Sequence, residues 1–146
     1  MEPPNQHDKD IENGYRVLLI IWLAILSSAV LFFLLTFVIP RPVSLDESPM
    51  LAWVLTGAGT LMALASFAPK EMFMEQAVQK QQQQLVHTGY IIAFAMSEAA
   101  GLFGLLAYFL TPGPYHYLLF VISVVFMFLH YPRRDHLRAA SFKKQG

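Results

Sequence analysis

Residues 17–39 read VLLIIWLAILSSAVLFFLLTFVI, a stretch without a charged residue that ends at Pro40. A helix needs about 20 residues to cross a hydrocarbon layer about 30 Å thick, so this stretch is long enough to span a membrane. Its only polar side chains are Ser27, Ser28 and Thr36, which leaves no polar stripe for the water-facing side of a soluble helix. The stretch therefore predicts a membrane-spanning helix.

Three more apolar blocks follow it along the chain. The first is rich in small side chains, the second carries a single acid, Glu98, and the third is bracketed by tyrosines. A Pro-Gly-Pro turn at 112–114 separates the last two blocks, because no helix runs through such a sequence. The chain is therefore predicted to be an all-α integral membrane protein with four transmembrane helices, at residues 17–39, 50–68, 90–111 and 115–131.

The composition of the 146 residues agrees with a membrane protein. Hydrophobic residues make up 55% and charged residues 14% of the chain, against about 25% charged residues in a typical soluble protein. Ten basic residues balance ten acidic ones, so no basic field favours nucleic acid as a partner. The absence of cysteine excludes disulfides, zinc–thiolate sites and cysteine nucleophiles. The partner that the composition predicts is the lipid bilayer.

Lysine and arginine in the short flanks predict the orientation, because these residues concentrate on the cytoplasmic side. With four spans, both ends and the middle connection lie on one side, which then holds nine basic residues against one, Arg41, on the other. We therefore expect a bacterial inner-membrane protein with a flexible cytoplasmic N-terminus at 1–16 and a basic cytoplasmic tail at 132–146. The nine basic residues are Lys9, Arg16, Lys70, Lys80, Arg133, Arg134, Arg138, Lys143 and Lys144.

The middle connection, residues 70–89, contains a run of glutamines broken only by Lys80. Its apolar residues recur at a loose helical spacing. We therefore expect the flanking helices to continue beyond the membrane before the chain turns.

Glu98 is the one ionisable side chain deep inside a predicted span. A charged carboxylate at the centre of a bilayer costs at least about 2.5 kcal/mol, so the group is expected to be protonated, paired or directed into a polar cavity. No Lys or Arg lies within the four spans to pair with it. We therefore predict that Glu98 binds a proton or a cation, or that a partner chain supplies the opposite charge.

Hydroxyl residues at the same depth are the candidate neighbours of Glu98. Thr56 and Thr60 are one helical turn apart and share a face, so they would offer hydroxyl groups to a protonated carboxyl. Together with Ser97 and Glu98 they form the predicted ion-binding set, which includes no metal site. Simple packing of hydroxyl residues is the alternative interpretation. Three further serines are predicted at this level: Ser27, Ser28 and Ser123.

Small residues that recur every four positions let membrane helices approach closely. Ala93, Ser97 and Gly101 follow this spacing, as do Ala100 and Gly104. We therefore predict a protein partner, or a second copy of the chain, packed through such faces. The predicted packing positions are Gly57, Gly59, Gly101 and Gly104.

The segment around the acid reads AMSEAAGLFGLL over residues 95–106. An acid followed at once by Ala, and five to seven positions later by an aromatic residue, Gly and Leu, resembles the carboxylate-bearing helix of the proteolipid c subunit of rotary F-type and V-type ATP synthases. The likeness covers about residues 50–111 and includes a short form of that family's glycine-rich helix at Gly57 and Gly59. The resemblance implies that Glu98 is the proton- or cation-binding acid of a translocating assembly and that the two glycines are positions of close packing.

Two other functions remain open at this stage. His87 and His130 are predicted at the same membrane interface, as two axial ligands of a membrane haem would be. A non-catalytic accessory or structural subunit of a larger membrane complex also fits four spans whose buried acid has no partner. The sequence contains no Gly-x-Ser-x-Gly, phosphate-binding loop or metal-spaced cluster, so no enzyme activity is expected, and outside the haem alternative no cofactor is expected.

Overall fold

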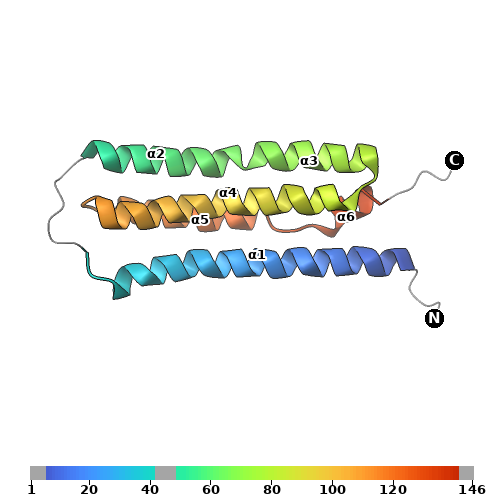
Figure 1. Cartoon of the computed structure of the whole chain (residues 1–146), viewed down its shortest axis with the longest axis horizontal. Helices are drawn as coiled ribbons and strands as arrows, with labels where there is room; N and C mark the ends of the chain where they lie inside the picture. Colours follow the sequence, from blue (N-terminus) through green and yellow to red (C-terminus); the bar gives the residue numbers. More distant parts are fainter. Residues whose placement is uncertain (1–5, 42–48, 142–146) are drawn as a thin grey trace.

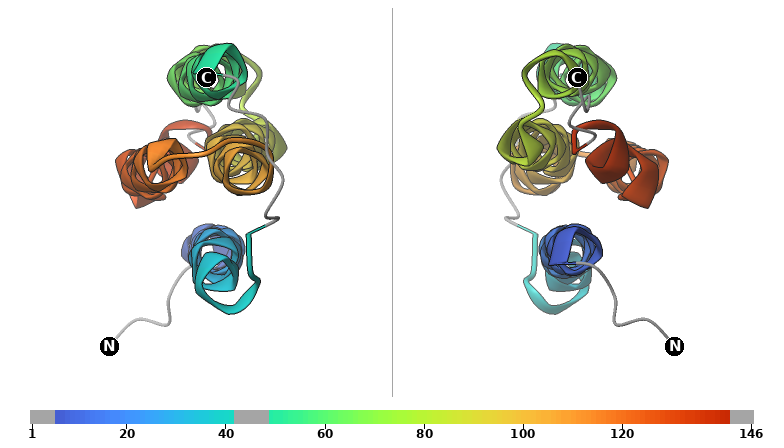
Figure 2. Two further views of the ribbon diagram at one scale, coloured as in Figure 1. Left: turned by 90° about the vertical axis from the view of Figure 1, so that its left-hand side faces the viewer. Right: turned by 90° about the vertical axis from the view of Figure 1, so that its right-hand side faces the viewer.

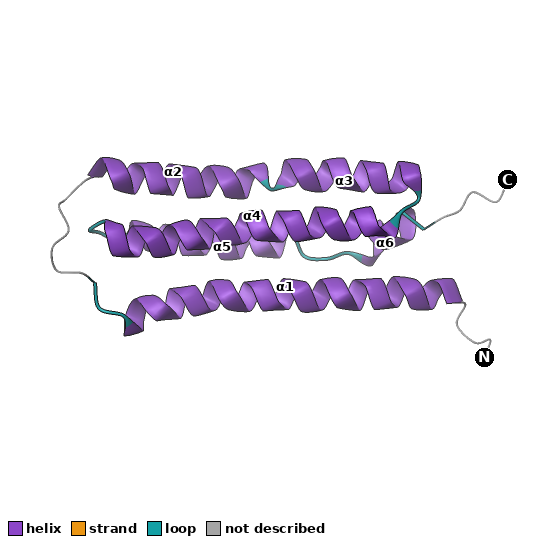
Figure 3. Ribbon diagram, in the orientation of Figure 1, coloured by secondary structure: helices purple, strands orange, loops and turns teal. Residues whose placement is uncertain are grey.

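The computed structural model describes residues 6–41 and 49–141, and within these ranges the chain is helical and contains no strand. The all-α prediction is confirmed. Figures 1 and 3 show the helices of these ranges in chain order: α1 (Gln6–Val38), α2 (Pro49–Ala65), α3 (Phe67–Lys80), α4 (Gln83–Leu110), α5 (Tyr115–Leu129) and α6 (Arg134–Ala139).

Helix α4 lies at the centre of the bundle and contacts α1, α2, α3 and α5. The end-on views of Figure 2 show α4 and α5 side by side, with α2 and α3 on one side of them and α1 on the other. The beginning of α1, the α3–α4 turn and α6 lie at one end of the bundle, which we call the α6 end (Figure 1). The end of α1, the start of α2 and the α4–α5 turn lie at the opposite end.

Three helical stretches are long and apolar enough to cross a membrane: Asp8–Val38, Pro49–Lys80 and Gln83–Leu110. Helix α5 is apolar but has 15 residues, about 22 Å at 1.5 Å per residue, which is less than the thickness of the hydrocarbon layer. Large apolar side chains cover the outside of the bundle, which suits a lipid environment. Examples are Ile20, Met50 and Trp53, which are 67%, 77% and 64% exposed.

Helices α2 and α3 form one rod that is interrupted only at Ser66 (Figure 1). The sequence predicts that the second span ends at Pro69, but this proline lies in the first turn of α3, where a missing N–H is tolerated best. At the interruption, the Ser66 N–H and hydroxyl both bond the Ala63 carbonyl, at 3.2 and 2.5 Å. The proline therefore breaks the hydrogen-bond pattern without ending the rod.

The glutamine run builds the turn between α3 and α4. Gln81 ends α3 in the left-handed conformation, with φ of 51°, and the Gln82 N–H bonds the Ala77 carbonyl at 3.1 Å. This is the hydrogen bond of a Schellman cap. Helix α4 then begins at Gln83, well before the apolar block at residue 90. Helix α4 therefore extends beyond its apolar block, while the expected continuation beyond the membrane stays a prediction.

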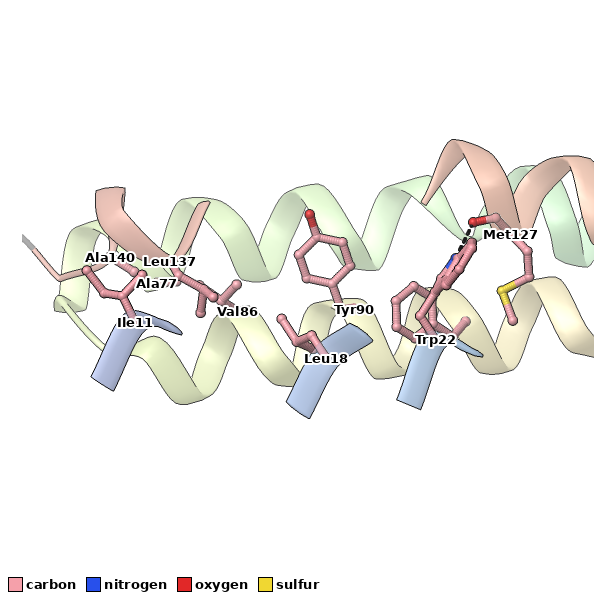
Figure 4. Close-up of a cluster of buried hydrophobic side chains, with 10 residues drawn as sticks. Ile11, Leu18, Trp22, Ala77, Val86, Tyr90, Met127, Leu137 and Ala140 are labelled. Carbon is pink, nitrogen blue, oxygen red and sulfur yellow. Dashed lines mark hydrogen bonds between the residues drawn. The ribbon is translucent and has the colours of Figure 1, made fainter. Parts of the chain in front are cut away.

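The two terminal segments contribute to the core of the α6 end (Figure 4). Ile11 of α1 is 6% exposed, and Leu137 and Ala140 are fully buried. Residues 6–16 are therefore helical, which differs from the flexible segment that we predicted, because Ile11 packs into the buried cluster. Residues 1–5 and 142–146, including Lys143 and Lys144, lie outside the described ranges.

Trp22 links α1 to α5 through a hydrogen bond and ring contacts (Figure 4). Its indole Nε1–H donates to the carbonyl oxygen of Met127 at 2.9 Å, and its ring packs edge-on against Phe128 and Tyr131. The Met127 carbonyl is among the last four of α5, which have no partner within the helix. Trp22 therefore caps α5 from a neighbouring helix.

Candidate functional site

Glu98 lies near the middle of α4, half-buried on the face that meets α1. Its Oε1 is hydrogen-bonded to Oγ of Ser28 on α1. The same Ser28 Oγ lies 2.9 Å from the carbonyl oxygen of Ile25, one turn earlier on α1. The acid and the serine therefore form a pair that joins two helices at mid-bundle.

The number of hydrogens at this pair bears on the protonation of Glu98. A serine hydroxyl has one hydrogen to donate, whereas Ser28 Oγ contacts two oxygens that accept when Glu98 is ionised. A protonated Glu98 removes this shortage, because it donates to Ser28 Oγ and Ser28 then donates to the Ile25 carbonyl. Neutral Glu98 thus gives a complete chain of two hydrogen bonds without a buried charge.

The other predicted members of the ion-binding set do not hydrogen-bond to Glu98. The Thr60 hydroxyl donates to the Thr56 carbonyl at 2.8 Å, and the Ser97 hydroxyl donates to the Ala93 carbonyl at 2.8 Å. The Thr56 hydroxyl is buried and has no partner among the residues that the structure describes. Adjacent residues on a helix point about 100° apart, so Glu98 and the buried Ser97 face different neighbours. The hydroxyl partner of Glu98 is therefore Ser28, and not Thr56 or Thr60 as we predicted.

Of the two glycines predicted on α2, one packs inside the chain. A Cβ atom at Gly59 would lie 2.7 Å from Leu119 Cδ2 on α5 and 3.1 Å from Phe103 Cβ on α4, so glycine permits the close approach of these helices. A Cβ atom at Gly57 would meet nothing within 4 Å. The prediction that Gly57 is a position of close packing is therefore wrong for this chain's own helices, because the residue faces outward.

Gly101 and Gly104 pack against α5. A Cβ atom at Gly101 would lie 3.2 Å from Ser123 Oγ, and one at Gly104 would lie 3.2 Å from the His116 carbonyl oxygen. The small-residue face of α4 is therefore occupied within the chain. It leaves no room at these two glycines for the second copy or partner that we predicted there.

The two histidines of the haem alternative have different surroundings. His130 is fully buried, and its Nε2 and Nδ1 contact Ser66 Oγ at 2.6 Å and Lys70 Nζ at 3.4 Å. Both ring nitrogens are thus engaged, which leaves none to ligate iron. His87 lies at the α1–α4 contact, where a Cβ atom at Gly14 would be 3.1 Å from its Nε2. The geometry gives no support to a haem bound by this pair.

Ser66 and His130 resemble a nucleophile and its base in distance, but not in access. Both side chains are fully buried, so a substrate does not reach them. The pair joins the α2–α3 interruption to the C-terminal end of α5 and has a structural role. Sequence reasoning missed it, because Ser66 and His130 are far apart in the chain and neither belongs to a motif.

The opposite end of the bundle carries a polar cluster around Arg41. Its guanidinium Nη2 donates to the Gly113 carbonyl and contacts His116 Nδ1, both at 3.0 Å, and lies over the Tyr108 ring. The Tyr108 hydroxyl in turn donates to the Ile39 carbonyl at 2.6 Å. This cluster ties the end of α1 to the α4–α5 turn.

Within residues 6–41 and 49–141, no group of three or more His, Cys, Asp or Glu side chains could hold a metal ion. No family model matches the chain, and no curated protein or solved structure matches it. The function is therefore inferred from the chemistry of the described residues.

Proposed function

We propose that the chain is a bacterial inner-membrane protein with four spans and cytoplasmic ends, in which Glu98 and Ser28 bind a proton inside the membrane. The observation that carries the proposal is the contact of Ser28 Oγ with both the Ile25 carbonyl and Glu98 Oε1. The hydrogen-bond chain is complete when Glu98 holds a proton and lacks a donor when it does not. Proton binding and release would thus change the contact between α1 and α4.

Three features support four spans and this orientation. Helix α5 lies along α4, and its outward side chains Val121 and Phe128 are 58% and 55% exposed, as expected for contact with lipid. A short span is accommodated by local thinning of the bilayer at modest cost. The basic flanks of the sequence gather at the α6 end, which favours the cytoplasm on that side.

A proton fits the pair better than a metal cation does. Cations such as Ca²⁺ take six or more oxygen ligands, with several carboxylates among them. The pair offers one carboxyl and one hydroxyl, and the described residues hold no acidic cluster for a metal. The proposal thus keeps the proton-binding acid that the proteolipid resemblance implies. It does not extend to a ring of copies packed through Gly59, Gly101 and Gly104, because these positions are filled from within.

Carbodiimide labelling tests the proton site, because the reagent modifies protonated carboxyl groups. We expect Glu98 to be labelled in membranes, the rate to fall as the pH rises, and sodium to have no effect. Ser28→Ala removes the acceptor of the acid's proton, which is worth about 1 kcal/mol, so labelling at alkaline pH should fall about fivefold. Ser27→Ala is the matched control, because among the described residues the Ser27 hydroxyl donates within its own helix, to the Leu23 carbonyl.

Three results would contradict the proposal. They are an unlabelled Glu98 in an intact membrane, labelling that sodium suppresses at constant pH, and equal labelling of the Ser28→Ala and Ser27→Ala variants. Mass spectrometry of the peptide that contains residue 98 distinguishes these results.

An accessory subunit is the second candidate, and Gly57 favours it. This glycine has open space around it and lies on the outward face of α2, near the exposed Trp53. The backbone of a partner helix could approach there. Because the chain has no cysteine, a Gly57→Cys variant carrying a thiol-linked photo-crosslinker in membranes tests for such a partner. We expect a crosslink to a different polypeptide, whereas a crosslink only to a second copy, or none, would contradict the accessory-subunit proposal.

A further inference from the structure

A cavity of about 410 Å³ opens at the α6 end, between α3 and the segment that joins α5 to α6. Its apolar wall includes Phe67 and Leu129, and its polar wall includes Lys70 and Arg133. Leu129 is the last residue of the apolar helix α5, and Phe67 is the first residue of the more polar helix α3. The cavity therefore lies where the apolar part of the bundle ends, at the level of lipid headgroups.

Neither cation of the cavity forms a close ion pair among the described residues, since both ion pairs found there involve Glu12. Lys70 Nζ contacts His130 Nδ1 at 3.4 Å and lies over the Tyr90 ring, and the charge of the nearby Glu71 acts favourably on it. Lys70 is half-buried, and Arg133 lies close enough for its charge to act unfavourably on that of Lys70. An anion bound between them would offset this repulsion, and phosphate oxygens match both an arginine fork and a lysine ammonium.

His136 adds a neutral donor to the same wall. The Tyr90 hydroxyl accepts from the Arg133 backbone N–H at 3.0 Å, and its oxygen lies 2.8 Å from His136 Nδ1. Burial, followed by the charges of Lys70 and Arg133, lowers the pKa of His136, which favours the neutral ring. In the tautomer whose Nδ1 accepts from the Tyr90 hydroxyl, the ring proton resides on Nε2. In that tautomer, a neutral His136 lining the cavity provides an N–H donor.

Two carboxylates line the cavity as well, Glu71 and Glu75. They are one helical turn apart on α3 and both are exposed. A purely anionic ligand would be repelled by them, whereas a ligand that carries a phosphate and an ammonium group would satisfy both signs of charge. The cavity thus has the charge pattern of a zwitterion.

We propose that this cavity binds the phosphoethanolamine headgroup of a membrane lipid, with Lys70 and Arg133 on the phosphate and the carboxylates of Glu71 and Glu75 on the ammonium. The acyl chains would continue over the exposed apolar surface that begins at Leu129. This site is separate from Glu98 and does not depend on proton binding there. It requires only that the apolar helices lie in a membrane.

Native mass spectrometry of the full-length protein in detergent tests the proposal. The probes are phosphatidylethanolamine, phosphatidylglycerol and phosphatidylcholine with identical acyl chains. We expect phosphatidylethanolamine to be retained about tenfold better than phosphatidylcholine, whose ammonium group has no N–H to donate to a carboxylate. We expect it to be retained better than phosphatidylglycerol as well, because the latter lacks a cationic group.

Variants with a matched control test whether the preferential retention of phosphatidylethanolamine arises from this cavity. Arg133→Gln should lower retention of phosphatidylethanolamine about tenfold. Arg134→Gln is the control and should leave it unchanged, because Arg134 pairs with Glu12 at 3.4 Å and lies over the Tyr15 ring. Combined Glu71→Gln and Glu75→Gln should abolish the preference over phosphatidylglycerol. All four residues are exposed, so these variants are expected to fold.

Three results would overturn the proposal. The first is a preference of the unaltered protein for phosphatidylglycerol, and the second is equal retention by the Arg133→Gln and Arg134→Gln variants. The third is displacement of the lipid by free phosphoethanolamine at equal concentration, which would identify a soluble ligand in place of a lipid.

Discussion

The two faces of α4 are packed in different ways. Towards α2 and α5, Gly59 and Gly104 let the helices approach so closely that an added Cβ atom would crowd its neighbours. Towards α1, Leu18 and Trp22 share a buried apolar cluster with Tyr90 and Phe94 of α4, the Ser28–Glu98 contact adds a polar link, and an apolar groove of about 300 Å³ lies between α1 and α5. The comparison shows that the close glycine contacts of α4 and its one ionisable side chain at mid-bundle, Glu98, face different neighbours.

Substitutions on α2 give the largest expected effect on this comparison. Gly59→Leu should lower the free energy of unfolding by about 3 kcal/mol, because the side chain has no space between Leu119 and Phe103. Gly57→Leu, two residues away in open space, should change it by less than about 0.5 kcal/mol. Thermal unfolding of both variants in the same detergent measures the difference. Equal loss of stability in the two variants would mean that α2 does not pack as described.

Removal of the Trp22 hydrogen bond should lower the free energy of unfolding by a smaller amount, because it weakens only the contact of α1 with the rest of the bundle. Trp22→Phe keeps an aromatic ring beside Phe128 but leaves the Met127 carbonyl without its donor, at a cost of about 1 kcal/mol. We expect faster hydrogen exchange in α1 and unchanged exchange at the α4–α5 contact. Faster exchange in all helices alike would show that the two sides of α4 unfold as one unit.

Acidification should weaken the docking of α6, with the smallest effect of the three. The pKa of His136 is lowered in the docked state, chiefly by burial, so undocked His136 binds protons first. Docking is therefore at full strength above pH 6.5 and weakens as the pH falls below that value. Cleavage by trypsin after Arg138 should become easier between pH 7.5 and 5.5. His136→Gln should remove this pH dependence, and a dependence that persists in that variant would exclude His136 as its source.

The sequence predicts much of the fold, because apolar length and proline positions are local features. It also indicates that the helices continue beyond the apolar blocks at the glutamine run. It does not predict that Pro69 stays within the rod or that Ile11 and Leu137 join one core, since both depend on contacts between distant segments.

The partner of Glu98 illustrates where sequence reasoning ends. Position along the predicted spans places Ser28 and Thr56 at the same depth as Glu98. The rotation of α4 about its axis decides which of the two hydroxyl residues Glu98 contacts. Once Gly101 and Gly104 face α5, Glu98 is turned towards α1. The spacing of Gly101 and Gly104 fixes the direction of Glu98 relative to them. It predicts the neighbour of Glu98 only when the helix that packs on the two glycines is known.

The rod of α2 and α3 has a geometrical consequence for any soluble partner. Its 32 residues measure about 48 Å, roughly 18 Å more than the hydrocarbon layer. With the apolar part of the rod in a membrane, this excess would extend beyond the hydrocarbon layer, where α3 packs against α4. A change in the tilt of α2 would displace the far end of the rod, at the α3–α4 turn, sideways. A small change of tilt within the membrane would therefore produce a larger displacement at that turn.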